Sequence, residues 1–256
     1  MERQHALRLA AFALVSSLVT VGAILGDRAL TAPAQRSSPV YDPPVLAGQQ
    51  LSGGCAGGVY ARKGDEIVLT STGHCSAEGV VVHDPDGTGV RGVFGPRAVD
   101  ASCPVPGHWC AASDINYLVV ARDRIPWGHL NVVDMGVGSY REIAAGTKAL
   151  SCADVAVGDG VEIDGREVYR AGHVTGKGDN NQDPALDGTY FPCMILSDIQ
   201  VASGDSGGVV LVRGIPAGVT SRSFGGYLGF TPLAEGLAEL GLTMCDMPAC
   251  GLTPDG

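Results

Sequence analysis

From about residue 52 onward, the sequence consists of short apolar runs separated by glycine, aspartate and proline. Residues 161–163 and 166–169, for example, flank Asp164-Gly165, a dipeptide typical of a two-residue β-hairpin turn. Many short strands at regular spacing are typical of β-sandwiches and β-barrels. The 38 glycines among 256 residues favour the same turn-rich architecture. We therefore expect an all-β protein, although periodicity alone does not distinguish two small packed barrels from one large sandwich.

One helix is expected near the C-terminus. Pro232 at its start and Gly241 after its end are typical helix boundary residues. Leu233, Leu237 and Leu240 would share one face, because residues three and four positions apart lie on the same side of a helix. The sequence thus predicts a β domain that ends in a short helix.

The first 34 residues are typical of an export signal. A short basic stretch precedes the uncharged apolar residues 9–25, and Ala-Pro-Ala at residues 32–34 offers a small-residue cleavage site. The apolar run is intermediate in length, so a cleaved signal peptide and an uncleaved signal anchor both stay open for residues 1–34. Residues 35–51 are expected to form a linker or short pro-segment. Both alternatives place the domain at residues 52–256 outside the cytoplasm.

All eight cysteines lie after this leader. An even number of cysteines in an exported chain indicates disulfides. A metal site is disfavoured because the sequence contains no Cys-x-x-Cys pair, and we expect neither a metal nor a cofactor. Sequence alone does not choose among the possible pairings, and our prediction joins neighbours along the chain: Cys55–Cys75, Cys103–Cys110, Cys152–Cys193 and Cys245–Cys250.

The charge of the chain narrows the choice of partners. Its formal net charge is −10, so nucleic acid and anionic lipid surfaces are not expected partners. Membrane contact is expected only through the possible N-terminal anchor, and we expect a monomer.

The clearest chemical motif is Gly-Asp-Ser-Gly-Gly at residues 204–208. A serine hydroxyl is a weak nucleophile that needs an adjacent base, and attack on a carbonyl needs donors for the oxyanion. In such a glycine-rich loop, the N–H groups of Gly204 and Ser206 can converge on one point. The simpler alternative is a glycine-rich turn between two strands.

A second motif supplies the base. The apolar run at residues 66–70 leads into Ser-Thr-Gly-His-Cys at residues 71–75, and histidine is the commonest general base near neutral pH. A Cys55–Cys75 bridge would hold His74 against the strand behind it. The remaining histidines lack a comparable setting and are expected to be surface or packing residues: His5, His83, His108, His129 and His173.

The third group must be a carboxylate that orients the imidazole. Asp114 begins an apolar strand, where a carboxylate can be held rigidly and partly shielded. Asp100, Asp123 and Asp134 are alternatives, and an aspartate at a strand entry is also a common turn residue.

The order His, Asp, Ser, with these two motifs, resembles the chymotrypsin-like serine proteases. The bacterial, streptogrisin-like branch is the most similar. Residues 218–221 resemble its substrate-binding strand, and residues 229–233 resemble its C-terminal segment. The resemblance covers about residues 52–243.

The resemblance implies a fold and a set of roles. Two packed six-stranded antiparallel β-barrels would cover about residues 52–125 and 140–243, with a short C-terminal helix and the active site between the barrels. Ser206 would be the nucleophile, His74 the base and then the acid, and Asp114 the orienting carboxylate. Peptide bonds would be hydrolysed through an acyl-enzyme, with the N–H groups of the serine loop as oxyanion donors.

The same resemblance implies a substrate-binding region. Ser221 and Ser223 would lie on the strand that pairs with the substrate backbone, and Gln200 would lie near the base of the specificity pocket. The full predicted set of substrate-binding residues is Gln200, Ser203, Thr220, Ser221, Arg222 and Ser223.

Several residues depart from the family pattern. Gln200 is not an aspartate, so a preference for Lys or Arg in the main pocket is not supported. Thr220 stands where glutamate-preferring relatives have histidine, and Arg222 could narrow the cleft or attract acidic substrates. No cysteine bridge joins the segment before Ser206 to the strand after it. No Arg-Ile-Val-Gly-Gly activation sequence is present, so Asp205 needs a partner other than a new amino terminus.

We therefore expect an exported serine endopeptidase that acts on proteins or peptides. The alternative is a secreted protease-fold module that binds or regulates with little or no turnover. An esterase with the same three groups would need a Gly-x-Ser-x-Gly turn on an α/β sheet, which the strand-rich pattern disfavours.

Overall fold

The computed structural model describes residues 44–51, 54–84, 86–87, 89–97, 109–136, 138–165, 168–179 and 189–252. The expected signal or anchor at residues 1–34 lies outside these ranges, so both alternatives stay predictions. No helix within the described ranges is long and apolar enough to cross a membrane.

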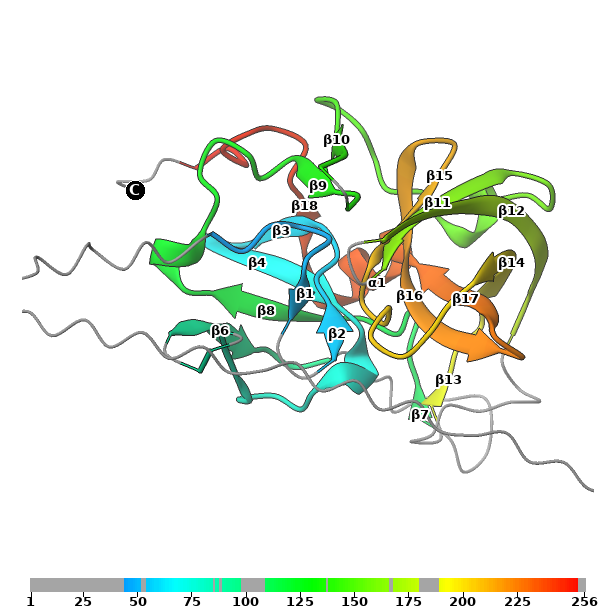
Figure 1. Cartoon of the computed structure of the whole chain (residues 1–256), viewed down its shortest axis with the longest axis horizontal. Helices are drawn as coiled ribbons and strands as arrows, with labels where there is room; N and C mark the ends of the chain where they lie inside the picture. Colours follow the sequence, from blue (N-terminus) through cyan, green and yellow to red (C-terminus); the bar gives the residue numbers. More distant parts are fainter. Residues whose placement is uncertain are drawn as a thin grey trace, which may run out of the picture. The chain divides into compact units, whose positions relative to one another are not determined.

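The C-terminal half forms a closed antiparallel barrel of six strands (Figure 1). Its strands follow the order β11 (Gly160–Gly165), β12 (Val168–Gly178), β14 (Met194–Gln200), β17 (Tyr227–Pro232), β16 (Ile215–Phe224) and β15 (Val209–Val212). Buried aliphatic and aromatic side chains, among them Ile163, Ile195 and Phe230, fill its interior.

The predicted hairpin between β11 and β12 is confirmed, but its predicted turn is wrong. Asp164 pairs with Tyr169 and Gly165 pairs with Val168, so both predicted turn residues belong to β11. Asp164 is fully buried, which a residue at an exposed hairpin tip would not be. The dipeptide therefore indicated the hairpin without locating its tip.

The N-terminal half forms a six-stranded antiparallel sheet. Its strands follow the order β18 (Thr243–Met244), β3 (Tyr60–Lys63), β4 (Glu66–Ser71), β8 (Asn116–Val120), β6 (Val90–Phe94) and β5 (Val81–His83). The predicted all-β class with two six-stranded units is confirmed. The first unit takes its outermost strand, β18, from the end of the chain, beyond the predicted limit of about residue 125 (Figure 1).

Residues 44–51 pack into the folded domain and do not form the separate linker predicted for residues 35–51, whose first part, residues 35–43, lies outside the described residues. Val45, Ala47 and Leu51 are at most 2% exposed. The N–H of Val45 donates to the carbonyl of Arg124 at 2.9 Å, and β1 (Gln50–Leu51) pairs with β2 (Cys55–Ala56). The apolar side chains of this segment pack into the N-terminal core, so the domain begins before residue 52.

Helix α1 (Leu233–Leu240) confirms the predicted C-terminal helix. Leu233, Leu237 and Leu240 are buried, and Gly241 ends the helix in the left-handed conformation with φ of 65°. Shorter elements complete the described chain: strands β7 (Trp109–Cys110), β9 (Val132–Asp134), β10 (Tyr140–Glu142) and β13 (Thr189–Tyr190), and 3-10 turns η1 (Gly73–Cys75), η2 (Arg122–Arg124) and η3 (Cys152–Asp154).

Three predicted disulfides are confirmed: Cys55–Cys75, Cys152–Cys193 and Cys245–Cys250. Cys103 lies outside the described residues, so its pairing with Cys110 stays a prediction.

Candidate active site

His74 lies in η1, immediately after the buried strand β4. The Cys55–Cys75 disulfide ties this turn to β2, and the side chain of His74 is 37% exposed. Gly73 allows a close approach, because a Cβ there would lie 3.0 Å from Asp114 Oδ1. The turn therefore exposes the imidazole to solvent, while the backbone of the turn stays tied to the rest of the domain.

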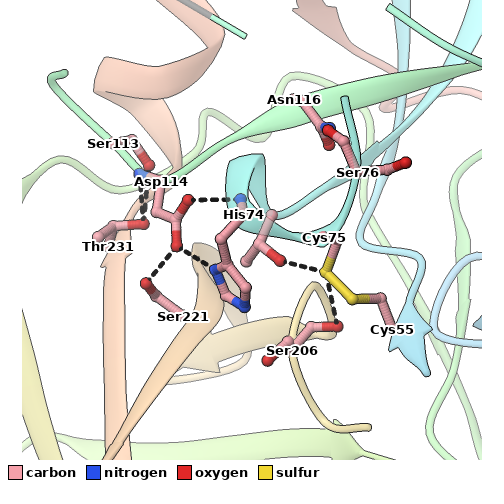
Figure 2. Close-up of polar contacts among 11 residues, drawn as sticks. Cys55, His74, Cys75, Ser76, Ser113, Asp114, Asn116, Ser206, Ser221 and Thr231 are labelled. Carbon is pink, nitrogen blue, oxygen red and sulfur yellow. Dashed lines mark hydrogen bonds and ion pairs between the residues drawn. A yellow bond between two sulfur atoms is a disulfide. The ribbon is translucent and has the colours of Figure 1, made fainter. Parts of the chain in front are cut away.

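Asp114 is 5% exposed and its carboxylate accepts three hydrogen bonds (Figure 2). His74 Nδ1 lies 2.7 Å from Oδ2, and the backbone N–H of His74 donates to Oδ1 at 3.2 Å. The Ser221 hydroxyl donates to Oδ2 at 2.6 Å. Because a carboxylate only accepts, Nδ1 carries a proton, and in the neutral ring Nε2 is then the acceptor at the opposite edge.

Side chains of the C-terminal barrel position Asp114, which belongs to the N-terminal half. Ser221 lies on β16, and Thr231 lies on β17 with its side chain fully buried. Thr231 Oγ1 accepts the N–H of Asp114 at 3.0 Å and the hydroxyl of Ser113 at 2.9 Å. Sequence reasoning gave Thr231 no role, although it lies in the segment at residues 229–233 that carried part of the resemblance.

The alternative aspartates are placed elsewhere. Asp123 lies in η2, and Asp134 Oδ1 accepts the N–H of Gly136 at 2.8 Å. Asp100 lies outside the described residues. Of the candidate aspartates that the structure describes, Asp114 is the one that is hydrogen-bonded to His74.

The loop that carries Ser206 is held by both halves of the domain. The carbonyl of Ser206 accepts the N–H of Ala56 at 2.6 Å and lies 4.0 Å from Cys75 Sγ. On the other side, the N–H of Gly207 donates to Thr220 at 2.8 Å. A Cβ on Gly207 would lie 2.2 Å from the carbonyl oxygen of Ala56, so this approach requires glycine. Figure 2 shows the ring edge opposite Asp114 pointing toward Ser206.

Two backbone amides of this loop are available to a ligand. Gly204 has φ of 101°, a conformation that glycine tolerates. The N–H of Asp205 donates to Ala202, but within the described residues the N–H groups of Gly204 and Ser206 have no internal acceptor. These two amides alternate along the turn with the N–H groups of Asp205 and Gly207, which are bonded internally. Amides without an internal acceptor can donate to an oxyanion.

Asp205 has an internal cationic partner. Its side chain is 1% exposed, and Oδ2 lies 2.9 Å from Arg170 Nη1. The N–H of Ala202 donates to the same oxygen at 2.8 Å, and Arg170 also donates to the carbonyl of Gln200 at 2.8 Å. Arg170 thus fills the role for which the sequence left Asp205 without a candidate.

The predicted substrate-binding residues differ in their exposure to solvent. Gln200, Ser203 and Ser223 are exposed, Arg222 is partly buried, and Thr220 is 2% exposed. Ser223 Oγ accepts the N–H of Gly226 at 3.1 Å, so its side chain supports the turn between β16 and β17. Because Ser221 Oγ is bound to Asp114, contact between Ser221 and a substrate would come through the backbone.

The other histidines that the structure describes lie at the surface. His83 and His129 are exposed, and His173 is 67% exposed beside Asp198. His5 and His108 lie outside the described residues. Among the residues that are described, no group of three or more His, Cys, Asp or Glu side chains could hold a metal ion.

Comparison with solved structures identifies the fold as that of bacterial chymotrypsin-like serine proteases. A glutamic acid-specific serine protease that uses a histidine triad in substrate binding is 24% identical, with a TM-score of 0.58 over 78% of this chain and 100% of that chain. Thermobifida fusca protease A is 21% identical, with a TM-score of 0.59 over 78% and 98% of the two chains. Nocardiopsis protease is 20% identical, with a TM-score of 0.58 and the same coverage. No protein-family model and no curated protein sequence matches the chain.

Proposed function

We propose that this chain, which has the fold of the bacterial chymotrypsin-like serine proteases, is an exported serine endopeptidase. The observation that carries the proposal is the 2.7 Å contact between His74 Nδ1 and Asp114 Oδ2, with Ser206 at the opposite edge of the ring. A leader typical of export and the disulfide-bonded cysteines support an extracytoplasmic location.

In the proposed reaction, His74 Nε2 takes the proton of the Ser206 hydroxyl as Oγ attacks a peptide carbonyl. The oxyanion accepts hydrogen bonds from the N–H groups of Gly204 and Ser206. His74 then protonates the leaving amine, and the acyl-enzyme remains on Ser206. A water molecule, deprotonated by His74, releases the acid and restores the serine. Asp114 acts as a carboxylate throughout and stabilises the imidazolium.

The first test is covalent labelling by a fluorophosphonate, followed by mapping of the labelled residue. We expect labelling at Ser206, its loss in Ser206→Ala, and a large decrease in His74→Ala, because the hydroxyl needs the base. Ser139→Ala is the matched control, because Ser139 is exposed in the turn between β9 and β10 and should label like the wild type.

A peptide-library digest then measures turnover directly. Wild-type protein should release peptides with free carboxyl and amino ends, and Ser206→Ala should not. A folded wild-type protein that shows neither Ser206-dependent labelling nor hydrolysis would instead support the alternative of a binding module.

A further inference from the structure

A hollow of about 270 Å³ opens on the surface of the C-terminal barrel, beside the predicted substrate-binding strand. Phe224, the last residue of β16, directly follows Ser223 and forms one wall of the hollow. Tyr227, the first residue of β17, forms another wall and pairs with Gln200. Along β16, Phe224 lies beyond Ser223 as seen from Ser221, so the hollow extends the predicted substrate path away from Asp114, to which Ser221 is hydrogen-bonded.

The hollow lies at an irregularity in the pairing of β14 with β17. Leu196 pairs with Gly229 and Gln200 pairs with Tyr227, so residues 197–199 face the single residue Leu228. Extra residues of this kind redirect a side chain out of the regular sheet pattern. Here the side chain of Asp198 is 51% exposed between two buried neighbours.

The walls combine apolar surface with one carboxylate. Leu196, Phe224 and Tyr227 supply exposed or partly exposed aliphatic and aromatic surface, and Asp198 also lines the hollow. Asp198 Oδ1 accepts the N–H of His173 at 2.6 Å. Its Oδ2 lies 3.8 Å from His173 Nδ1, which is beyond hydrogen-bond distance, so this oxygen can accept a proton donor from a ligand.

We propose that this hollow is a distal subsite that takes a lysine or arginine side chain of the peptide substrate. The alkyl stem of such a side chain packs on apolar walls, and its cation interacts with an aromatic face and a carboxylate. The subsite rests on the proposed endopeptidase function. It is separate from the main specificity pocket, whose Gln200 offers no charge to a basic side chain.

The test compares peptides that differ only in lysine or norleucine, placed in turn at the third to sixth residue on each side of the cleaved bond. Norleucine keeps the alkyl chain and removes the cation. Wild-type kcat/KM should favour lysine by about three- to thirtyfold at one position and be equal elsewhere. Asp198→Asn should remove this preference without changing turnover of the norleucine peptide. Asp123→Asn is the control, an exposed aspartate of the N-terminal half that should keep the preference.

The same peptide pair titrated into Ser206→Ala separates this proposal from the proposed function. Tighter binding of the lysine peptide, lost in the Ser206→Ala, Asp198→Asn double variant, supports the subsite even if the wild type shows no turnover. Equal affinity and equal kcat/KM for lysine and norleucine at every position would overturn it.

Discussion

Single side chains that hold Asp114 decide how well the proposed base works. Ser221 donates one of the three hydrogen bonds to this buried carboxylate. Replacing Ser221 with alanine should lower kcat roughly ten- to a hundredfold, because a hydrogen bond to a charged group is worth about 1.5–3 kcal/mol. Steady-state kinetics on one peptide checks this, with Ser139→Ala as the exposed control. A kcat equal to that of the control would mean that Asp114 does not need this donor.

Arg170 should be required for stability because Asp205 is buried beside it. Arg170→Met leaves that carboxylate without its cation and should lower the free energy of unfolding by about 3 kcal/mol. Urea unfolding measures the change. The double variant Arg170→Met, Asp205→Asn removes the charge as well and should recover part of the loss. Equal destabilisation of the single and double variants would show that the charge pair is not the cause.

At this scale, sequence motifs led to the proposed reacting groups but not to the side chains that hold them in place. His74 and Ser206 lie within short motifs in which the adjacent residues, such as Cys75 and Gly207, also have a structural role. Arg170 and Thr231 act through contacts with residues more than thirty positions away, such as the 2.9 Å ion pair with Asp205 and the 3.0 Å bond from Asp114. No local sequence pattern predicts such contacts, so only the folded structure shows them.

Helix α1 packs directly behind the Asp114 segment. A Cβ on Gly236 would lie 2.6 Å from Ile115 Cγ2 and 2.9 Å from Ser113 Cβ. Gly236→Ala should therefore destabilise the protein by about 1–3 kcal/mol and lower kcat, because overpacking displaces the neighbours of Asp114. Thermal unfolding and kinetics measure both effects. Ala238→Ser, on the exposed face of the same helix, should change neither. An unchanged Gly236→Ala protein would contradict the tight packing.

Element types were predicted more reliably than element limits. Helix α1 was found because Pro232 and Gly241 have backbone preferences that act locally. The hairpin tip was misplaced at Asp164 because burial of that residue in β11 outweighs the turn preference of the dipeptide. The predicted linker at residues 35–51 rested on the proline, serine and glutamine content of that stretch, whereas Val45, Ala47 and Leu51 within it reach the core.

The complete domain requires residues that sequence reasoning left outside it. A chain that begins at Ser52 loses Val45 and Leu51 from the core, where each contributes about 1.5–3 kcal/mol. That loss approaches the total stability of many domains. We expect the chain from Ser52 to unfold at a much lower temperature than the chain from Asp42. Circular dichroism on heating tests this, and identical melting curves would contradict a structural role for residues 44–51.

The pairing of β18 with β3 determines when the domain can be completed. During synthesis, the half that bears His74 and Asp114 emerges early but waits for β18, which follows every strand of the C-terminal barrel in the sequence. Thr243–Met244 and the N–H of Cys245, which donates to Tyr60, arrive after Ser206, Ser221 and Thr231. A nascent chain that has not yet reached β18 would therefore leave β3 without its outer neighbour, and the N-terminal sheet would be completed only after the C-terminal barrel has been synthesised.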